Sequence, residues 1–156
     1  MQFSKVIGQE EMKSQLVKMV TGNHLSHALL FLGKEGTGGL LLARAFAQYI
    51  VCEKVHPQEK KPDMFDTALF DTPPAEPVFL SDSCGECAAC KKAAALIHPD
   101  IHFSFPVISK KSDKPVSADY ITEFRSFIAD HPYANAYDWL QFIGAENRQG
   151  NINVHE

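Results

Sequence analysis

The sequence predicts an α/β fold in which a parallel sheet is flanked by helices and a four-cysteine module is inserted. An apolar run at 27–32, closed by glycines and followed at once by a helical pattern, is typical of a strand, loop and helix over residues 27–52. All four cysteines fall between positions 52 and 90. A chain of 156 residues, of which 45% are apolar, is long enough for one domain with a core of its own.

The loop after the apolar run is similar to a phosphate-binding loop that has lost its chemical groups. In the pattern G-x-x-x-x-G-K-[ST], backbone amides surround the phosphates, the lysine neutralises them and the hydroxyl binds magnesium. Gly33, Gly36 and Gly38 keep the frame, but Gly39 stands in place of the lysine and Leu40 in place of the hydroxyl. Loss of the charged contact alone costs about 1.5–3 kcal/mol, so we expect no catalytic residue and no tight ATP binding at this vestigial loop.

Two other interpretations of the loop stay open. A glycine-rich turn between any strand and any helix would share part of this pattern. In the second interpretation Lys34, displaced toward the strand, replaces the missing amine, although position 40 offers no hydroxyl for the metal.

Helices are predicted on both sides of the strand. The first begins at residues 8–10, and its apolar positions recur at helical spacing, so Lys13 should lie in water. The second runs from 40 to 51 and is apolar almost all round. We therefore expect it to be buried, with Arg44 and Gln48 on its wetter side.

The composition changes over residues 53–83. This stretch carries five prolines and a run of charged residues, and no hydrophobic period persists in it. Such a segment cannot bury enough surface to order itself as a helix or a sheet. We expect a long surface excursion, partly disordered, between two ordered parts of the chain.

The cysteines form the strongest chemical signal in the chain. Cys84, Cys87 and Cys90 are spaced so that their thiolates can turn around one ion, and Cys52 is the only cysteine left to complete a set of four. Four thiolates favour a structural zinc with no open coordination position. The predicted zinc module spans residues 52–97, and the metal would hold its ends together.

Two alternatives to zinc stay open. An iron–sulfur cluster also uses the spacing C-x-x-C-x-x-C, but its usual fourth cysteine followed by proline is absent, because Cys90 leads into Lys91. The other alternative is four unligated thiols.

The residues after the cysteines predict mainly helices. Residues 88–97 have helical spacing, and 101–105 alternate as a strand does. A helical segment over 117–144 follows, with Ser117 as its N-cap and Trp139 in a core or an interface. Two clear strands are fewer than the roughly five of a parallel sheet of this class, which indicates the N-terminal part of a longer protein.

Charge and hydropathy exclude other classes. No apolar run approaches the roughly 20 residues that cross a bilayer, and the first residues lack a signal-peptide core, so a soluble, cytoplasmic protein with no membrane partner is expected. The net charge of −4 argues against a general nucleic-acid coat, because such binders rely on basic residues to displace counterions.

Several motifs resemble the bacterial clamp-loader subunits of DNA polymerase III, which are AAA+ P-loop proteins. The resemblance is good up to Asp100 and loose beyond it. The residues that carry it are Phe3-x-x-Val6-Ile7-Gly8-Gln9, His27-Ala28-Leu29-Leu30-Phe31, the loop from Gly33 to Gly39, the four cysteines, and His98-Pro99-Asp100. It implies that residues 1–156 are the N-terminal part of an AAA+ domain and that the cysteines form an inserted zinc module.

The resemblance also implies a role in DNA replication. Some subunits of this family hydrolyse ATP, whereas others have a damaged loop and do not, and Gly39 and Leu40 place this chain with the second kind. It would be a structural subunit that supports ATP-dependent loading of the sliding clamp. Its partners would be the gamma or tau and the delta subunits, and it would meet the clamp and primer–template DNA indirectly.

The chain departs from the family in two ways. The excursion at 53–83 is longer than the few residues common between the first cysteine and the other three, so the position of Cys52 is unusual for the family. The Walker B strand and the arginine motif that serves a neighbouring subunit's ATP are not found in these residues.

Three other functions compete. One is an active ATPase of the gamma or tau kind that uses Lys34. Another is a P-loop nucleoside kinase with a zinc-bearing lid, but such a lid needs phosphate-binding arginines and residues 53–83 contain none. The last is a zinc-centred nucleic-acid binder, which the acidic balance disfavours.

Overall fold

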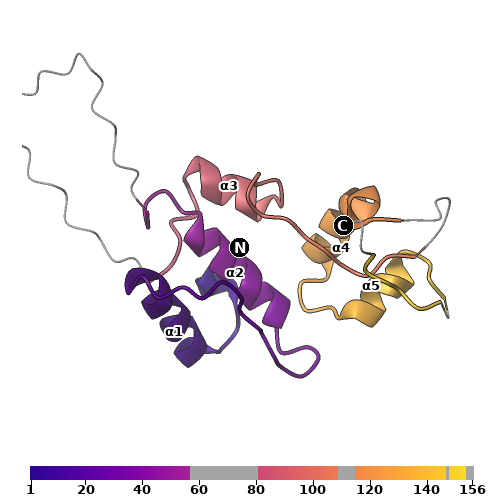
Figure 1. Ribbon diagram of the computed structural model, residues 1–156, viewed down its shortest axis with the longest axis horizontal. Helices are drawn as coiled ribbons and strands as arrows, with labels where there is room; N and C mark the ends of the chain where they lie inside the picture. Colours follow the sequence, from indigo (N-terminus) through magenta and orange to yellow (C-terminus); the bar gives the residue numbers. More distant parts are fainter. Residues whose placement is uncertain (57–80, 109–114, 147, 154–156) are drawn as a thin grey trace, which may run out of the picture.

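The computed structural model describes residues 1–56, 81–108, 115–146 and 148–153, and the regular elements within these ranges are all helices. They form two groups along the longest axis of the molecule (Figure 1). The first group contains α1, α2 and α3, and the second contains α4 and α5. The chain passes from the first group to the second after α3.

The bounds of the helices follow most of the sequence predictions. The first group consists of η1 (Phe3–Lys5), α1 (Glu10–Thr21), α2 (Gly39–Ile50) and α3 (Ala88–Ala94). The second consists of η2 (Ser117–Tyr120), α4 (Ile121–Asp130) and α5 (Ala136–Phe142). The helix predicted over 88–97 ends early because Leu96 takes a left-handed φ of 59°, a conformation that does not continue a helix.

The predicted parallel sheet is absent from these ranges. Residues 27–32 form no strand, and neither do residues 101–105. A single antiparallel bridge joins Val107 to Asn151. A strand forms only where a neighbour accepts and donates its backbone hydrogen bonds, and the described residues place no second strand beside 27–32. The prediction of strands at both places was therefore wrong for this part of the chain.

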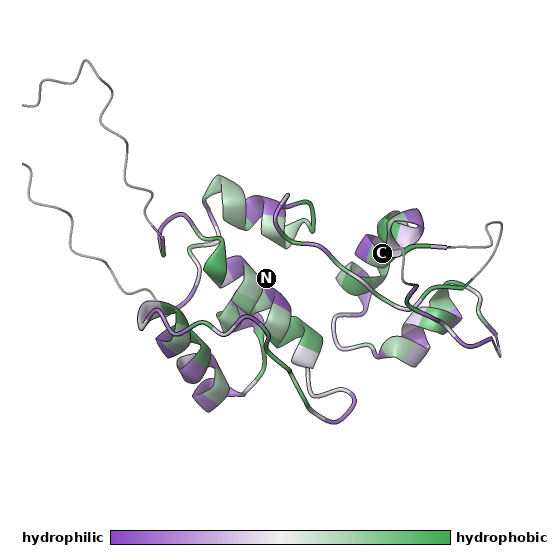
Figure 2. Ribbon diagram, in the orientation of Figure 1, coloured by the Kyte–Doolittle hydropathy of each residue, from purple (hydrophilic) through white to green (hydrophobic). Residues whose placement is uncertain are grey.

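The first core lies between η1, α1 and α2. Its buried members are Phe3, Val6, Leu16, Leu41, Leu42, Ala45, Phe46 and Tyr49. α2 is the more hydrophobic of the two long helices, as Figure 2 shows, and its burial was predicted correctly. Gln48, however, is 1% exposed rather than on a wet side. Its side-chain amide has hydrogen-bond partners within the protein: its Oε1 accepts from the Met1 amine, and its Nε2 donates to Ser83 Oγ at 3.0 Å.

Lys13 also differs from its prediction. It is buried, and its Nζ donates to Val6 O at 2.7 Å and to Glu10 Oε1 at 2.7 Å. A buried ammonium costs free energy unless its hydrogens find acceptors, and these two bonds pair two of its three hydrogens. The lysine thereby ties α1 to the segment that follows η1.

The second core is aromatic. The rings of Phe105 and Phe124 stack with centroids 3.9 Å apart, and Trp139 meets Phe105 edge-on at 5.1 Å. Trp139 is 2% exposed and its Nε1 donates to Pro106 O at 2.7 Å, which confirms its predicted place in the core. Ser117 is not an N-cap: its Oγ accepts from Phe105 N at 2.9 Å and thereby holds the extended segment against η2.

The excursion predicted over 53–83 lies largely outside the described residues, because 57–80 are not among them.

Candidate metal centre and glycine loop

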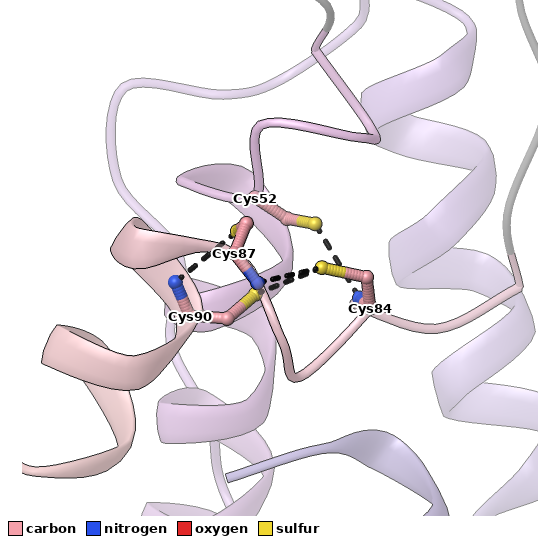
Figure 3. Close-up of side chains that lie close together, drawn as sticks. All are labelled: Cys52, Cys84, Cys87 and Cys90. Carbon is pink, nitrogen blue, oxygen red and sulfur yellow. Dashed lines mark hydrogen bonds between the residues drawn. The ribbon is translucent and has the colours of Figure 1, made fainter.

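Four cysteines meet beside the C-terminal end of α2 (Figure 3). Cys52 follows α2, Cys84 and Cys87 lie in the turn before α3, and Cys90 lies in the first turn of α3. The turn depends on Gly85, whose φ of 72° is a conformation that other residues rarely adopt. All four residues that the sequence singled out as ligands are thus brought together.

The cluster has the dimensions of a four-thiolate site. The ligand atoms all lie within 4.8 Å of one another, and the Sγ atoms of Cys84 and Cys90 are 3.8 Å apart. Sulfurs at about 2.3 Å from a tetrahedral zinc are about 3.8 Å from each other by simple geometry. A disulfide needs a separation of about 2.05 Å, and all four cysteines are free. The arrangement could therefore hold a metal ion.

Backbone amides point at three of the sulfurs. Cys84 N donates to Cys52 Sγ, Cys87 N to Cys84 Sγ and Cys90 N to Cys87 Sγ, each at 3.4 Å. Hydrogen bonds of this kind favour the thiolate, which is the form that binds metals.

The pKa values of two thiols move in opposite directions. Burial raises the pKa of Cys84, but hydrogen bonds from the backbone of Cys87 and Glu86 and from neighbouring thiols outweigh burial and lower that pKa to about 6. Burial also raises the pKa of Cys90, and there the opposing backbone bond from Gly85 is too weak to offset it, so the pKa stays well above its ordinary value. Hydrogen bonds to sulfur therefore favour the thiolate of Cys84, whereas burial favours the neutral thiol of Cys90.

Two side chains after α2 fasten the module to this helix. Glu53 Oε1 accepts from Ala89 N at 3.1 Å, so its carboxylate lies at the N-terminus of α3, where the helix dipole favours a negative charge. Lys54 Nζ lies 3.5 Å from Glu86 Oε2. The first contact orders the helix that carries Cys90, and the second is an exposed pair of small energetic value.

A third attachment joins the module to the N-terminal segment. Asp82 Oδ1 accepts from Phe3 N and Oδ2 accepts from Ser4 N, both at 2.9 Å. Gln2 Nε2 donates to Ser83 O at 2.8 Å. Sequence reasoning missed Asp82, because at the end of a proline-rich stretch it looks like any other loop carboxylate.

The glycine loop runs from Gly33 to Gly38, and α2 begins at Gly39. Gly36 and Gly38 take φ of 75° and 81°, so both need the freedom of glycine. Leu40, at the position where a phosphate-binding loop has its hydroxyl, is 45% exposed. Lys34 is exposed, and its carbonyl accepts from Thr37 Oγ1 at 2.7 Å, which closes the loop on itself.

Residues from elsewhere in the chain surround this loop. Gln9 Nε2 donates to Thr37 O at 2.5 Å, and Tyr133 Oη accepts from Ile7 N at 3.1 Å. Together with Leu32, these residues line an open hollow of about 710 Å³. Within the described residues, no helix has the length and apolar character to cross a membrane.

Comparison with known proteins identifies a group of relatives. Residues 8–71 match the family described as "DNA polymerase III, delta subunit". DNA polymerase III subunit tau of Bacillus subtilis is 34% identical over 89 residues, which are 57% of this chain and 12% of that protein. Subunit delta' of Pseudomonas aeruginosa is 27% identical over 103 residues, 66% of this chain and 24% of that protein.

Subunit tau/gamma of Haemophilus influenzae is 34% identical over 89 residues, 57% of this chain and 10% of that protein. The matched part thus spans a quarter or less of each relative. No solved structure matches the chain significantly. These matches support a relationship to the clamp-loader subunits of DNA polymerase III.

Proposed function

We propose that this chain serves as a non-hydrolysing structural subunit of the DNA polymerase III clamp loader, of the delta-prime kind. It would support ATP-dependent loading of the sliding clamp during DNA replication without being an enzyme itself. Its direct partners would be gamma or tau and delta subunits, and it would meet the sliding clamp and primer–template DNA through them. The observation that carries the proposal is the loss of both reactive side chains at Gly39 and Leu40.

The physical argument starts from what the loop retains. Its glycines still allow the tight turn into α2, so the surfaces that surround it keep their shape. Without the amine, one charge-assisted contact to a phosphate is lost, at about 1.5–3 kcal/mol, which weakens binding by roughly tenfold to a hundredfold. Without a hydroxyl, magnesium loses a protein ligand as well. A subunit of this kind stays in one state while its neighbours cycle.

A nucleotide titration tests this proposal. A labelled ATP analogue with magnesium is added up to millimolar concentration to the wild-type chain and to the double variant Gly39→Lys, Leu40→Thr. A Cβ at position 39 would meet nothing closer than Phe31 O at 3.8 Å, and position 40 is half exposed, so both side chains have room. We expect no saturation for the wild type and at least tenfold tighter binding by the variant.

Saturation of the wild type at micromolar nucleotide would contradict the proposal. It would favour the second candidate, an ATP-hydrolysing subunit of the gamma or tau kind. Two of the relatives carry the tau name, which is the observation behind this candidate. Lys34 would then have to supply the amine, and Lys34→Met would abolish the binding.

We also propose that the four cysteines hold one structural zinc. The Sγ separation and the three N–H bonds to sulfur support this assignment. Protein purified without chelator should contain one zinc per chain by atomic absorption. Cys87→Ser and Cys52→Ser should each lose the metal and lower Tm, whereas the exposed Glu86→Gln should keep it. Zinc retained after Cys52→Ser would show that the fourth ligand is another group.

A further inference from the structure

The aromatic ring of Tyr133 forms one contact between the two helix groups, at the glycine loop. Tyr133 lies between α4 and α5 in the second group, yet it packs against the first core. Its hydroxyl accepts from Ile7 N at 3.1 Å, 126 residues away in sequence. Figure 1 shows the loop at the end of α2 that faces the α4–α5 connection.

The contact with Gly38 shows how closely the ring fits. A Cβ on Gly38 would lie 2.9 Å from Tyr133 Cε1, closer than real Cβ contacts, so the ring sits where a side chain would otherwise be. Gly38 therefore has two reasons to be glycine, its φ of 81° and this ring. The loop residue and the tyrosine are matched in shape.

A second polar contact lies beside the first. Asn135 Nδ2 donates to Glu35 Oε2 at 3.3 Å, which joins the same two segments. Asn135 is itself fixed, because its Oδ1 accepts from Asp138 N at 2.9 Å as the N-cap of α5. The residue that caps α5 thus also contacts the glycine loop.

We propose that Tyr133 is a latch that docks the second helix group on the glycine loop. The loop then holds a side chain of its own protein, and this contact joins the two groups at a place separate from the bond that Arg125 Nε of α4 donates to Leu96 O at 3.1 Å. This docking does not depend on the proposed loss of nucleotide binding.

Backbone amide exchange of the whole chain, followed by NMR, tests the latch. Tyr133→Phe keeps the ring and removes only the hydroxyl, so it should not unfold the protein. We expect exchange at the Ile7 amide to rise about threefold to tenfold, the equivalent of one hydrogen bond, while the Phe127 amide of α4 is unchanged. Tyr133→Ala should also expose the Gly38 and Gly39 amides.

Tyr137→Phe is the matched control, because Tyr137 lies in the first turn of α5 and is 66% exposed. In this variant the exchange rate of the Ile7 amide should equal that of the wild type. Unchanged exchange at Ile7 in Tyr133→Phe would overturn the latch, and so would an equal rise in both variants. The nucleotide titration of the wild type is a separate measurement, so failure of the latch and failure of the proposed function can be told apart.

Discussion

The Sγ atoms of Cys84 and Cys90 lie 3.8 Å apart, yet the two thiols should differ strongly in their rates of alkylation in metal-free protein. Backbone N–H bonds lower the pKa of Cys84 to about 6, whereas burial keeps that of Cys90 well above its ordinary value. At pH 7 Cys84 is then mostly thiolate, and the thiolate is the reactive form. We expect iodoacetamide to label Cys84 first and Cys90 last, as mass spectrometry of peptides would show.

The rate at which Cys84 is labelled should depend on pH in a way that reflects its lowered pKa. Because the pKa of Cys84 is depressed, its labelling should persist as pH falls from 9 to about 6 and decline about tenfold per pH unit below that value. Zinc should protect all four thiols. Labelling of Cys90 ahead of Cys84 at pH 7 would contradict the hydrogen-bond arrangement.

At the scale of elements, α3 depends on a carboxylate from outside its own sequence. It has 7 residues, so it is too short to be stable alone, and Glu53 accepts from Ala89 N at its first turn. Glu53→Ala should cost about 0.5–1 kcal/mol of unfolding free energy in urea and speed exchange at the Ala89 amide. Glu86→Ala removes only an exposed ion pair and should leave exchange at the Ala89 amide unchanged. Equal exchange rates in the two variants would argue against a capping role of Glu53.

The helices were predictable because their signals are local. α1 begins at Glu10, where the first helix was predicted to begin, and α2 (Gly39–Ile50) lies one residue from the predicted 40–51, since apolar spacing acts within the segment. The grouping of Cys84, Cys87 and Cys90 followed from their spacing, and Cys52 was added to them as the only cysteine left. The environments of Lys13 and Gln48 were not predictable, because their partners, Val6 O and Ser83 Oγ, come from other segments. The strand at 27–32 failed for the same reason: a strand needs a neighbour that its own sequence does not supply.

Over the whole molecule, the candidate metal centre and the N-terminal segment form one unit. Asp82 stands two residues before Cys84 and accepts from both Phe3 N and Ser4 N, while Phe3 packs in the first core. The second core shares none of these residues. A change at the cysteines should therefore reach the start of the chain before it reaches α4.

Removal of the metal by a chelator tests this coupling. We expect amide exchange at Phe3 and Ser4 to accelerate by tenfold or more, because the cysteines no longer hold Asp82 in place, while α4 amides keep their protection. Asp82→Asn should give a smaller rise at the same two amides with the metal still bound, since the Asn side chain keeps one oxygen acceptor and its NH2 group cannot accept the other bond. Asp130→Asn, at an exposed position in α4, is the control. If chelation left Phe3 and Ser4 protected, the first core alone would order the N-terminal segment, and the metal would act only on α3.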